Sequence, residues 1–236
     1  MRGLTQTFNK GLAYETTAVD DVSFDIDGGE FVAIVGHTGS GKTTLVQHLN
    51  GLLRPTSGTI TLAGVDISAK TPEAMDMRKR IGMVFQYPEY QLFEETNYKD
   101  VAFGPKNMGL DERETDLRVR EAFSLLGLDF AELSGKSPYE LSGGQKRMMA
   151  MAGVVAMKPD IFILDEPTAG LDPKAHDSVL EIVRSLRERT GSTVIIISHN
   201  MDDVARFAGR IMVMSDGKLI ADGTPAEVFA DVAMIE

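Results

Sequence analysis

The sequence predicts an α/β fold built around a mainly parallel β-sheet. Short apolar runs of strand length alternate with longer segments of helical periodicity, which is typical of parallel strands joined by crossover helices. The apolar run Phe31–Val35 is followed at once by a glycine-rich loop and then by a predicted helix over 42–50. Near the end of the chain, Asp216-Gly217 lies between two apolar runs and predicts an antiparallel hairpin. We expect a single domain over residues 1–236.

The same signals place the remaining elements in order. Strands are expected over 31–35, 58–62, 81–85, 161–164, 193–198, 211–214 and 218–221. Helices are expected over 42–50, 111–126, from the segment 141–145 to about 157, and over 172–189. Asp172 is a good helix cap and Pro173 suits the first helical position, so the last of these helices has a defined start.

Residues 87–140 have a different character. Tyr87–Tyr90 predicts a loop, and 111–126 predicts an amphipathic helix whose apolar side includes Leu117. Nothing in this region has the pattern of a long buried strand. We therefore expect a helical subdomain over about 87–157, inserted into the α/β core.

Composition excludes several classes of protein. The chain has 236 residues, 43% of them hydrophobic and 25% charged, which is ordinary for a soluble globular protein. It has no cysteine, so disulfides and thiolate zinc sites are impossible, and a reducing cytosol is compatible. A formal net charge of −11 weakens the case for nucleic-acid binding. No apolar run approaches the roughly 18 residues of a membrane span, and no signal sequence is expected at the N-terminus, so a membrane role requires a partner.

The loop after the first buried strand fits the phosphate-binding pattern G-x-x-x-x-G-K-[ST]. It contains Gly36, His37, Thr38, Gly39, Ser40, Gly41, Lys42 and Thr43, followed by Thr44. Its glycines let backbone N–H groups turn toward phosphates, and the helix N-terminus adds partial positive charge. Lys42 is placed to reach the β- and γ-phosphates and Thr43 to bind Mg²⁺. The alternative is a glycine-rich turn that happens to precede a helix.

Polar side chains end three of the predicted strands. Asp165 and Glu166 follow 161–164, Gln86 follows 81–85, and His199 follows 193–198. Because open α/β sheets bind ligands beyond the carboxyl ends of their strands, Asp165 is placed to hold Mg²⁺. The alternative for Asp165 and Glu166 is an acidic strand exit in a loop. An isolated glutamine or histidine at a strand end usually has no special role.

A second glycine-rich segment lies about a hundred residues later. Leu141 is followed by Ser142, Gly143, Gly144 and Gln145 at the start of a predicted helix. Bare N–H groups and the serine hydroxyl make an anion site there. No phosphate bound by the same chain is expected at this site. The alternative is an ordinary helix cap.

The two glycine-rich segments together resemble the ATP-binding-cassette ATPases, a class with a P-loop NTPase core, an antiparallel β subdomain and an inserted helical subdomain. The resemblance implies that ATP lies between the phosphate loop of one subunit and the LSGGQ segment of another, so the chain works as a dimer. It also implies that Glu166 is the general base, that Gln86 senses Mg²⁺ and the attacking water, and that His199 contacts the γ-phosphate. Asp172 ends a loop that crosses the dimer interface in this family.

The family also stacks an aromatic side chain on adenine, from a loop after the first strand. Phe8 fits the spacing better than Tyr14. Packing in the core is the alternative for either residue.

Five further segments narrow the resemblance to the ATPase subunits of energy-coupling-factor importers. These segments are 36–41, 50–52, 87–93, 100–105 and 137–141. Thr38 and the long loop 9–17 resemble the second of two paralogous ATPases in the heterodimeric members. Such importers take up vitamins or transition-metal ions, so the resemblance implies ATP and Mg²⁺ as cofactors and a peripheral location at the cytoplasmic face of the membrane.

The implied partners are a second cassette, identical or paralogous, and integral membrane subunits contacted through 86–93 and the helical subdomain. No nucleic-acid partner is expected. Family members usually continue beyond the position of Glu236 with residues that contribute to dimer contacts.

Other cassette proteins fit less well. Cassette ATPases of DNA maintenance insert a long coiled coil or zinc modules, whereas 87–140 is short and the chain lacks cysteine. Translation-associated cassette proteins carry two cassettes and basic linkers. The ATPase of another transporter class is the nearer alternative.

Overall fold

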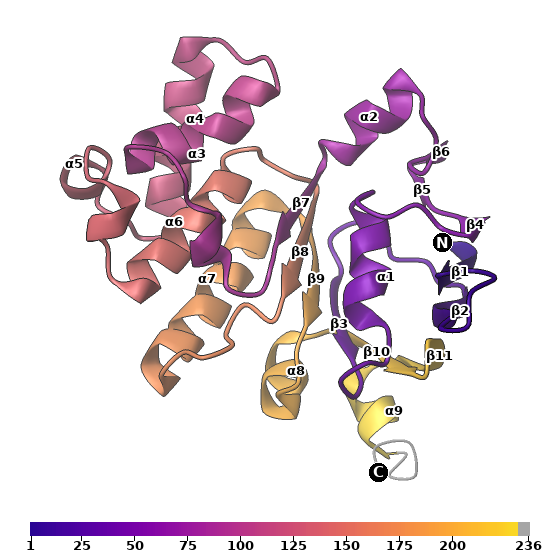
Figure 1. Ribbon diagram of the computed structural model, residues 1–236. Helices are drawn as coiled ribbons and strands as arrows, with labels where there is room; N and C mark the ends of the chain where they lie inside the picture. Colours follow the sequence, from indigo (N-terminus) through magenta and orange to yellow (C-terminus); the bar gives the residue numbers. More distant parts are fainter. Residues whose placement is uncertain (231–236) are drawn as a thin grey trace. The chain divides into compact units, whose positions relative to one another are not determined.

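The computed structural model describes residues 1–230, which form two compact units (Figure 1). The first unit contains residues 1–81 and 193–230 of the part of the chain that the structure describes. The second unit contains Gly82–Ser192.

Four strands of the first unit lie side by side in the order β11-β10-β3-β9. Their bounds are β3 (Phe31–Val35), β9 (Thr193–Ile197), β10 (Arg210–Ser215) and β11 (Lys218–Gly223). β3 pairs in parallel with both β9 and β10, while β11 pairs with β10 antiparallel. Every residue of β3 and β9 is buried, as parallel strands covered on both faces should be. The predicted strands and the predicted hairpin are confirmed.

Antiparallel strands complete the β-structure of the first unit. β1 (Arg2–Phe8) lies between β2 (Thr16–Val22) and β4 (Ser57–Thr59), and β5 (Thr61–Leu62) pairs with β6 (Val65–Asp66). The prediction of one strand over 58–62 is wrong, because the chain changes partner at Ile60. That residue is buried, and its carbonyl accepts a hydrogen bond from Ile67 N at 2.9 Å.

Short helices connect these strands. They are α1 (Lys42–Leu49), α2 (Pro72–Arg78), α8 (Met201–Phe207) and α9 (Pro225–Ala230). α1 directly follows the glycine-rich loop, and its Leu45 and Val46 are fully buried. The predicted helix over 42–50 is therefore confirmed, and its packing fixes the orientation of the first turn.

The second unit is mainly helical. It contains two strands that are neighbours in a sheet, β7 (Ile81–Val84) and β8 (Ile161–Asp165). The first residue of β7, Ile81, belongs to the first unit. The helices of the second unit are α3 (Asn97–Asn107), α4 (Glu112–Leu125), α5 (Phe130–Leu133), α6 (Gly143–Val155) and α7 (Pro173–Thr190). Two 3-10 helices, Pro88–Gln91 and Pro138–Glu140, join them. α3, α4 and α6 pack on one another and bury Val101, Phe123 and Met149.

Two details of the second unit differ from expectation. The predicted loop at Tyr87–Tyr90 is a 3-10 turn, because Pro88 supplies a helical φ at its first position and Tyr87 adopts a left-handed φ of 57° before it. Leu117 is 48% exposed, because the buried side of α4 is formed by Thr115, Val119 and Ala122. At 100° per residue, position 117 faces the opposite way. Among residues 1–230, no helix combines the length and the apolar character that crossing a bilayer requires.

Close packing at Gly82 generates a stability prediction. A Cβ at this position of β7 would lie 2.5 Å from Cγ1 of Val154 and 2.9 Å from Cγ of Pro159. Gly82→Ala is therefore expected to lower the free energy of unfolding by about 1–3 kcal/mol, because neighbouring side chains must shift. Urea unfolding followed by circular dichroism measures the change.

Gly153→Ala is the matched control, because a Cβ on this helical residue meets only Asp100 O, at 4.0 Å. It is expected to raise the free energy of unfolding by about 0.5–1 kcal/mol through helix propensity. If Gly82→Ala is as stable as the wild type, the neighbouring side chains accommodate a Cβ at this position and the prediction is wrong.

Candidate functional site

The phosphate loop between β3 and α1 holds a backbone that only glycine adopts without strain. Gly36 and Gly41 have φ of 147° and 99°. A Cβ on Gly36 would overlap Met214 O, and one on Gly41 would overlap Ala18 O. The loop therefore lies against backbone on both sides, and its shape is set before any ligand binds.

Lys42 fills the interior of this loop. The residue is only 5% exposed. The ammonium donates to Gly36 O at 2.7 Å, His37 O at 2.9 Å and Ser40 Oγ at 3.4 Å. A cation among carbonyl oxygens at a helix N-terminus is placed to exchange those partners for phosphate oxygens.

The other predicted residues of the loop are close to solvent. His37, Thr38, Gly39 and Thr43 are exposed, Thr44 is half-buried, and Ser40 is fully buried. Ser40 is held in the loop, because its N donates to His37 O and its carbonyl accepts from Gly217 N at 3.1 Å each. Thr43 presents its hydroxyl in the first turn of α1.

Both aromatic candidates for adenine stacking lie at the surface of the first unit. Phe8 is the last residue of β1, opposite Thr16 of β2, and is 36% exposed. Tyr14 lies in the loop between these strands and is 67% exposed. Neither belongs to the core, so each offers an aromatic face to a ligand.

His199 follows the end of β9 and is exposed. Its neighbours hold the backbone there. Asn200 caps α8 by accepting from Asp202 N and Asp203 N, and its own N donates to Ser198 Oγ at 3.1 Å. This turn leaves His199 exposed, just beyond the carboxyl end of a buried strand.

In the second unit, Gln86 and Glu166 meet although 80 positions separate them in sequence. Nε2 of Gln86 donates to Oε2 of Glu166 at 3.1 Å. Glu166 has a left-handed φ of 48°, a conformation that costs about 1–3 kcal/mol and is common at active sites. Asp165, the last residue of β8, is 5% exposed. The structure brings these predicted residues together at the ends of β7 and β8.

The LSGGQ segment begins α6 with a reciprocal cap. Ser142 Oγ accepts from Gln145 N at 3.3 Å, and Gln145 Oε1 accepts from Ser142 N at 3.0 Å. The residues Ser142, Gly143 and Gly144 are exposed. Because the cap uses the serine oxygen as an acceptor, its hydroxyl hydrogen remains available to a ligand.

Asp172 caps α7 as predicted, and it is exposed. Its Oδ1 accepts from Lys174 N and Ala175 N, both at 3.1 Å. The second carboxylate oxygen is left at the surface.

Arg147 is a residue that sequence analysis missed. Its guanidinium is almost completely buried and makes a two-pronged contact with Glu89, with Nε–Oε2 at 3.2 Å and Nη2–Oε1 at 3.0 Å. Nη1 also donates to Pro167 O at 3.1 Å and Ala169 O at 2.9 Å. Arg147 therefore joins α6, the turn after Gln86 and the loop after Glu166. The only feature of the sequence that could have identified Arg147 is its position two residues after Gln145.

The donor chemistry fits Mg²⁺. Among residues 1–230 there is no group of three or more histidines and carboxylates that could hold a metal ion by itself. Mg²⁺ does not require one, since it is usually held by one or two protein oxygens together with substrate phosphates and water. Thr43, Gln86 and Asp165 each offer an oxygen of the type that Mg²⁺ prefers.

Comparison with known proteins agrees with these features. The protein family described as ABC transporter matches residues 19–169. The chain is 52% identical over 236 residues to the energy-coupling factor transporter ATP-binding protein EcfA2 of Clostridium tetani, and the match covers all of this chain and 82% of that protein. It is 53% identical over 229 residues to EcfA2 of Caldanaerobacter subterraneus subsp. tengcongensis, covering 97% of this chain and 80% of that protein.

Two solved structures share the fold. One is cbiO1 from Clostridium perfringens, described as part of the ABC transporter complex cbiONQ, with a TM-score of 0.86, 39% identity and coverage of 98% of this chain and 89% of that chain. The other is dimeric MJ0796 bound to ADP and phosphate, with a TM-score of 0.83, 27% identity and coverage of 95% and 97%.

These similarities confirm the fold class and the family resemblance expected from the motifs. The chain belongs to the ABC transporter family, among its energy-coupling factor ATP-binding proteins.

Proposed function

We propose that the chain is the ATP-binding subunit of an energy-coupling factor importer and that it hydrolyses ATP in a dimer to drive uptake of a micronutrient. The observation that carries this proposal is the 52% identity to an EcfA2 protein over the full length of the chain. Vitamins and transition-metal ions are the solutes that the resemblance implies, and a membrane subunit would recognise them.

This chain supplies one half of each ATP site. The loop 36–44 cradles the triphosphate, with backbone N–H groups around it and Lys42 at the β- and γ-phosphates. Phe8 stacks on adenine, with Tyr14 as the alternative. Thr43, Gln86 and Asp165 are the residues that would hold Mg²⁺, which neutralises the charge that develops on the phosphates.

The other half comes from a second cassette. Exposed Ser142, Gly143 and Gly144 offer N–H groups and a hydroxyl with no phosphate of their own chain to bind, and Gln145 braces the turn. Asp172 contributes at the same interface. The partner is a second copy or a paralogue.

Hydrolysis needs a water held in line with the γ-phosphate. Glu166 accepts its proton as general base, Gln86 orients Glu166 and the water, and His199 contacts the γ-phosphate. Most of the rate enhancement then comes from positioning and from electrostatic stabilisation of the transferring group.

The second unit also presents a surface suited to a membrane subunit. Large side chains in and near 86–93 are exposed, namely Tyr87 at 43%, Tyr90 at 84%, Phe93 at 58% and Phe103 at 44%. The Phe93 and Phe103 rings meet edge to face at 4.9 Å. Clustered exposed aromatic side chains are typical of protein interfaces. We place the chain at the cytoplasmic face of the membrane as one cassette domain over 1–236 whose helical subdomain covers about 87–157.

Glu166→Gln tests the catalytic assignment. The amide keeps the size of the side chain but cannot accept a proton, so ATP binding should persist while turnover falls on the order of 100-fold or more. Fluorescent-nucleotide binding and phosphate release measure the two quantities. Glu188→Gln, on the exposed surface of α7, is the control and should retain normal turnover. Near-normal hydrolysis by Glu166→Gln would refute its role as general base.

Ser142→Arg tests the shared site. A long cation at the start of α6 should block the partner's triphosphate, so the chain should still bind ATP but hydrolyse it at least about 100-fold more slowly. Ser142→Ala removes only the hydroxyl and should have a smaller effect. Specific activity of the wild type should also fall on dilution, as the dimer dissociates. Full activity of Ser142→Arg would rule out a site built from two subunits.

Arg147→Lys tests whether Arg147 positions the loop after Glu166. Lysine keeps the charge but cannot make the fork to Glu89 and two carbonyl contacts together. We expect kcat to fall about tenfold to a hundredfold with KM for ATP little changed. In the double variant Arg147→Lys/Glu89→Gln, the rise in the activation free energy should be smaller than the sum of the rises in the two single variants. An unchanged kcat in a folded Arg147→Lys protein would contradict a positioning role.

A further inference from the structure

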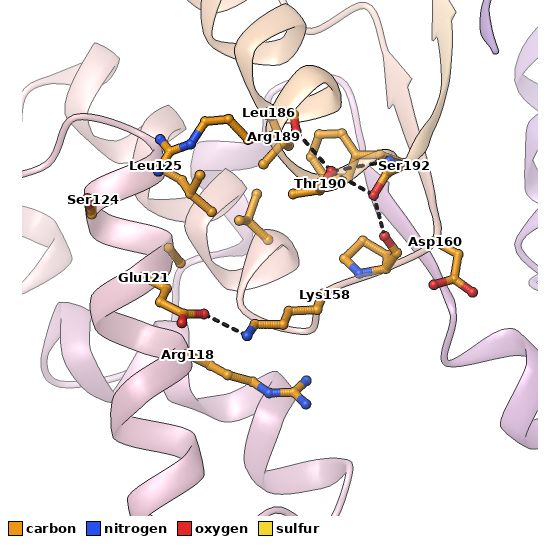
Figure 2. Close-up of a pocket in the computed structure, with 14 residues that line it drawn as sticks. Arg118, Glu121, Ser124, Leu125, Lys158, Asp160, Leu186, Arg189, Thr190 and Ser192 are labelled. Atoms are coloured by element: carbon orange, nitrogen blue, oxygen red, sulfur yellow. Dashed lines mark hydrogen bonds and ion pairs between the residues drawn. The ribbon is translucent and has the colours of Figure 1, made fainter. Parts of the chain in front are cut away.

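A cavity of about 490 Å³ lies within the second unit (Figure 2). Its walls come from α4, the turn after α6, the start of β8 and the end of α7. None of the residues assigned to the nucleotide site lines it. Its volume is within the range of about 300–1,000 Å³ that small-molecule sites have.

The floor of the cavity is apolar. Ala122, Val155, Phe162 and Leu186 contribute to it, and each is buried in the unit. Leu125 and Pro159 extend this surface. Such a lining favours the apolar body of a ligand, because covering it removes apolar area from water.

The rim of the cavity carries cations. The Arg189 guanidinium makes no hydrogen bond or ion pair with any other residue of 1–230. In Figure 2 it extends from α7 toward Leu125 of α4. Lys158 pairs with Glu121 at 2.6 Å, and Arg118 Nε pairs with Glu114 at 2.8 Å. With Asp160, the lining holds three cations and two carboxylates in a chain whose net charge is −11.

Lys158 reaches the rim through a strained backbone. It follows the end of α6 with a left-handed φ of 53°, and its N donates to Val155 O at 2.9 Å. Glycine is the usual residue at such a position because it has no Cβ to clash. The lysine at this position brings its ammonium to the cavity at a cost in backbone strain, and strain of this kind is a feature of ligand sites.

Three elements connect the cavity with the other end of the second unit. α6 begins beside Ser142 and reaches the cavity at Val155; β8 ends at Asp165 and reaches it at Phe162. α7 is capped by Asp172 and reaches the cavity with its last turns. A ligand between these far ends contacts all the elements that carry Ser142, Asp165 and Asp172.

We propose that this cavity is an effector site for a small amphipathic carboxylate whose occupancy changes the rate of ATP hydrolysis. The carboxylate pairs with Arg189, whose planar fork matches it, and the apolar body covers the floor. Lys158 and Arg118, each paired with a glutamate, lie on the same rim. The regulatory half of the inference rests on the proposed ATPase function, whereas the binding half does not.

Octanoate is the probe for binding, measured by isothermal titration calorimetry on the whole chain. Octanamide has the same body without the charge, and acetate has the charge without the body. We expect saturable 1:1 binding of octanoate, binding of octanamide at least about tenfold weaker, and no saturation with acetate. Absence of saturable octanoate binding overturns the proposal, and so does equal affinity for octanamide.

Arg189→Gln should weaken octanoate binding at least about tenfold. Arg184→Gln is the matched control, because Arg184 is on the same helix, pairs with Glu181 and Glu188, and does not line the cavity. It should bind octanoate normally. Lys158→Gly should also weaken binding, yet unfold at the same or a higher temperature because it releases the left-handed strain. Wild-type affinity in Arg189→Gln overturns the assignment.

Hydrolysis by the assembled dimer, with and without octanoate, tests regulation. We expect octanoate to change the rate about fivefold or more in the wild type and in Arg184→Gln, but not in Arg189→Gln. Binding with an unaltered rate overturns the regulatory half alone. A wild-type dimer with no ATPase activity even without octanoate contradicts the proposed function instead, and leaves the binding result standing.

Discussion

Two glycines of the phosphate loop have no room for a side chain, and the first unit depends on that constraint. Gly36 lies against the carbonyl of Met214 in β10, and Gly41 lies against the carbonyl of Ala18 in β2. The hairpin turn joins the same assembly, because Gly217 N donates to Ser40 O and Gly217 O accepts from Asp20 N. The loop is thus held by backbone contacts on two sides. A loop ordered in this way would lose little conformational entropy on binding the phosphates that we propose it holds.

In the second unit, the contacts of Arg147 hold neighbouring segments together, as the glycine contacts do in the first unit. Arg147 is a buried cation, and its four hydrogen bonds compensate the loss of hydration that burial imposes. Two of these bonds hold Glu89, beside the exposed aromatic surface, and two hold the loop after Glu166. A displacement of either segment therefore alters the same guanidinium. If a membrane subunit docks at 86–93 as proposed, this arrangement gives a physical route by which docking would affect Glu166, the proposed general base.

The candidate site residues of this protein lie mainly at the ends of helices and strands. Helix N-termini present backbone N–H groups, as at the starts of α1 and α6, and strand ends release side chains such as Asp165 from the sheet. The opposite ends of α6, β8 and α7 are free of those functions and enclose the cavity instead. Rigid elements with one end in each region are a means of coupling them, since packed helices shift as units rather than deform continuously.

Sequence patterns were sufficient to predict the buried strands, the helices α1, α4, α6 and α7, and the identity of nearly every candidate site residue. These features depend on local patterns, namely apolar periodicity, glycine at tight turns and caps at helix starts. The sequence analysis missed β1 and β2, in which few side chains are buried, and it misplaced Leu117 and the turn after Tyr87. The three-dimensional structure was needed to show that Gln86 meets Glu166, that Arg147 joins three segments, and that Arg189 has no partner among residues 1–230 beside an apolar cavity. Each of those facts depends on contacts between residues distant in the chain, which local periodicity does not encode.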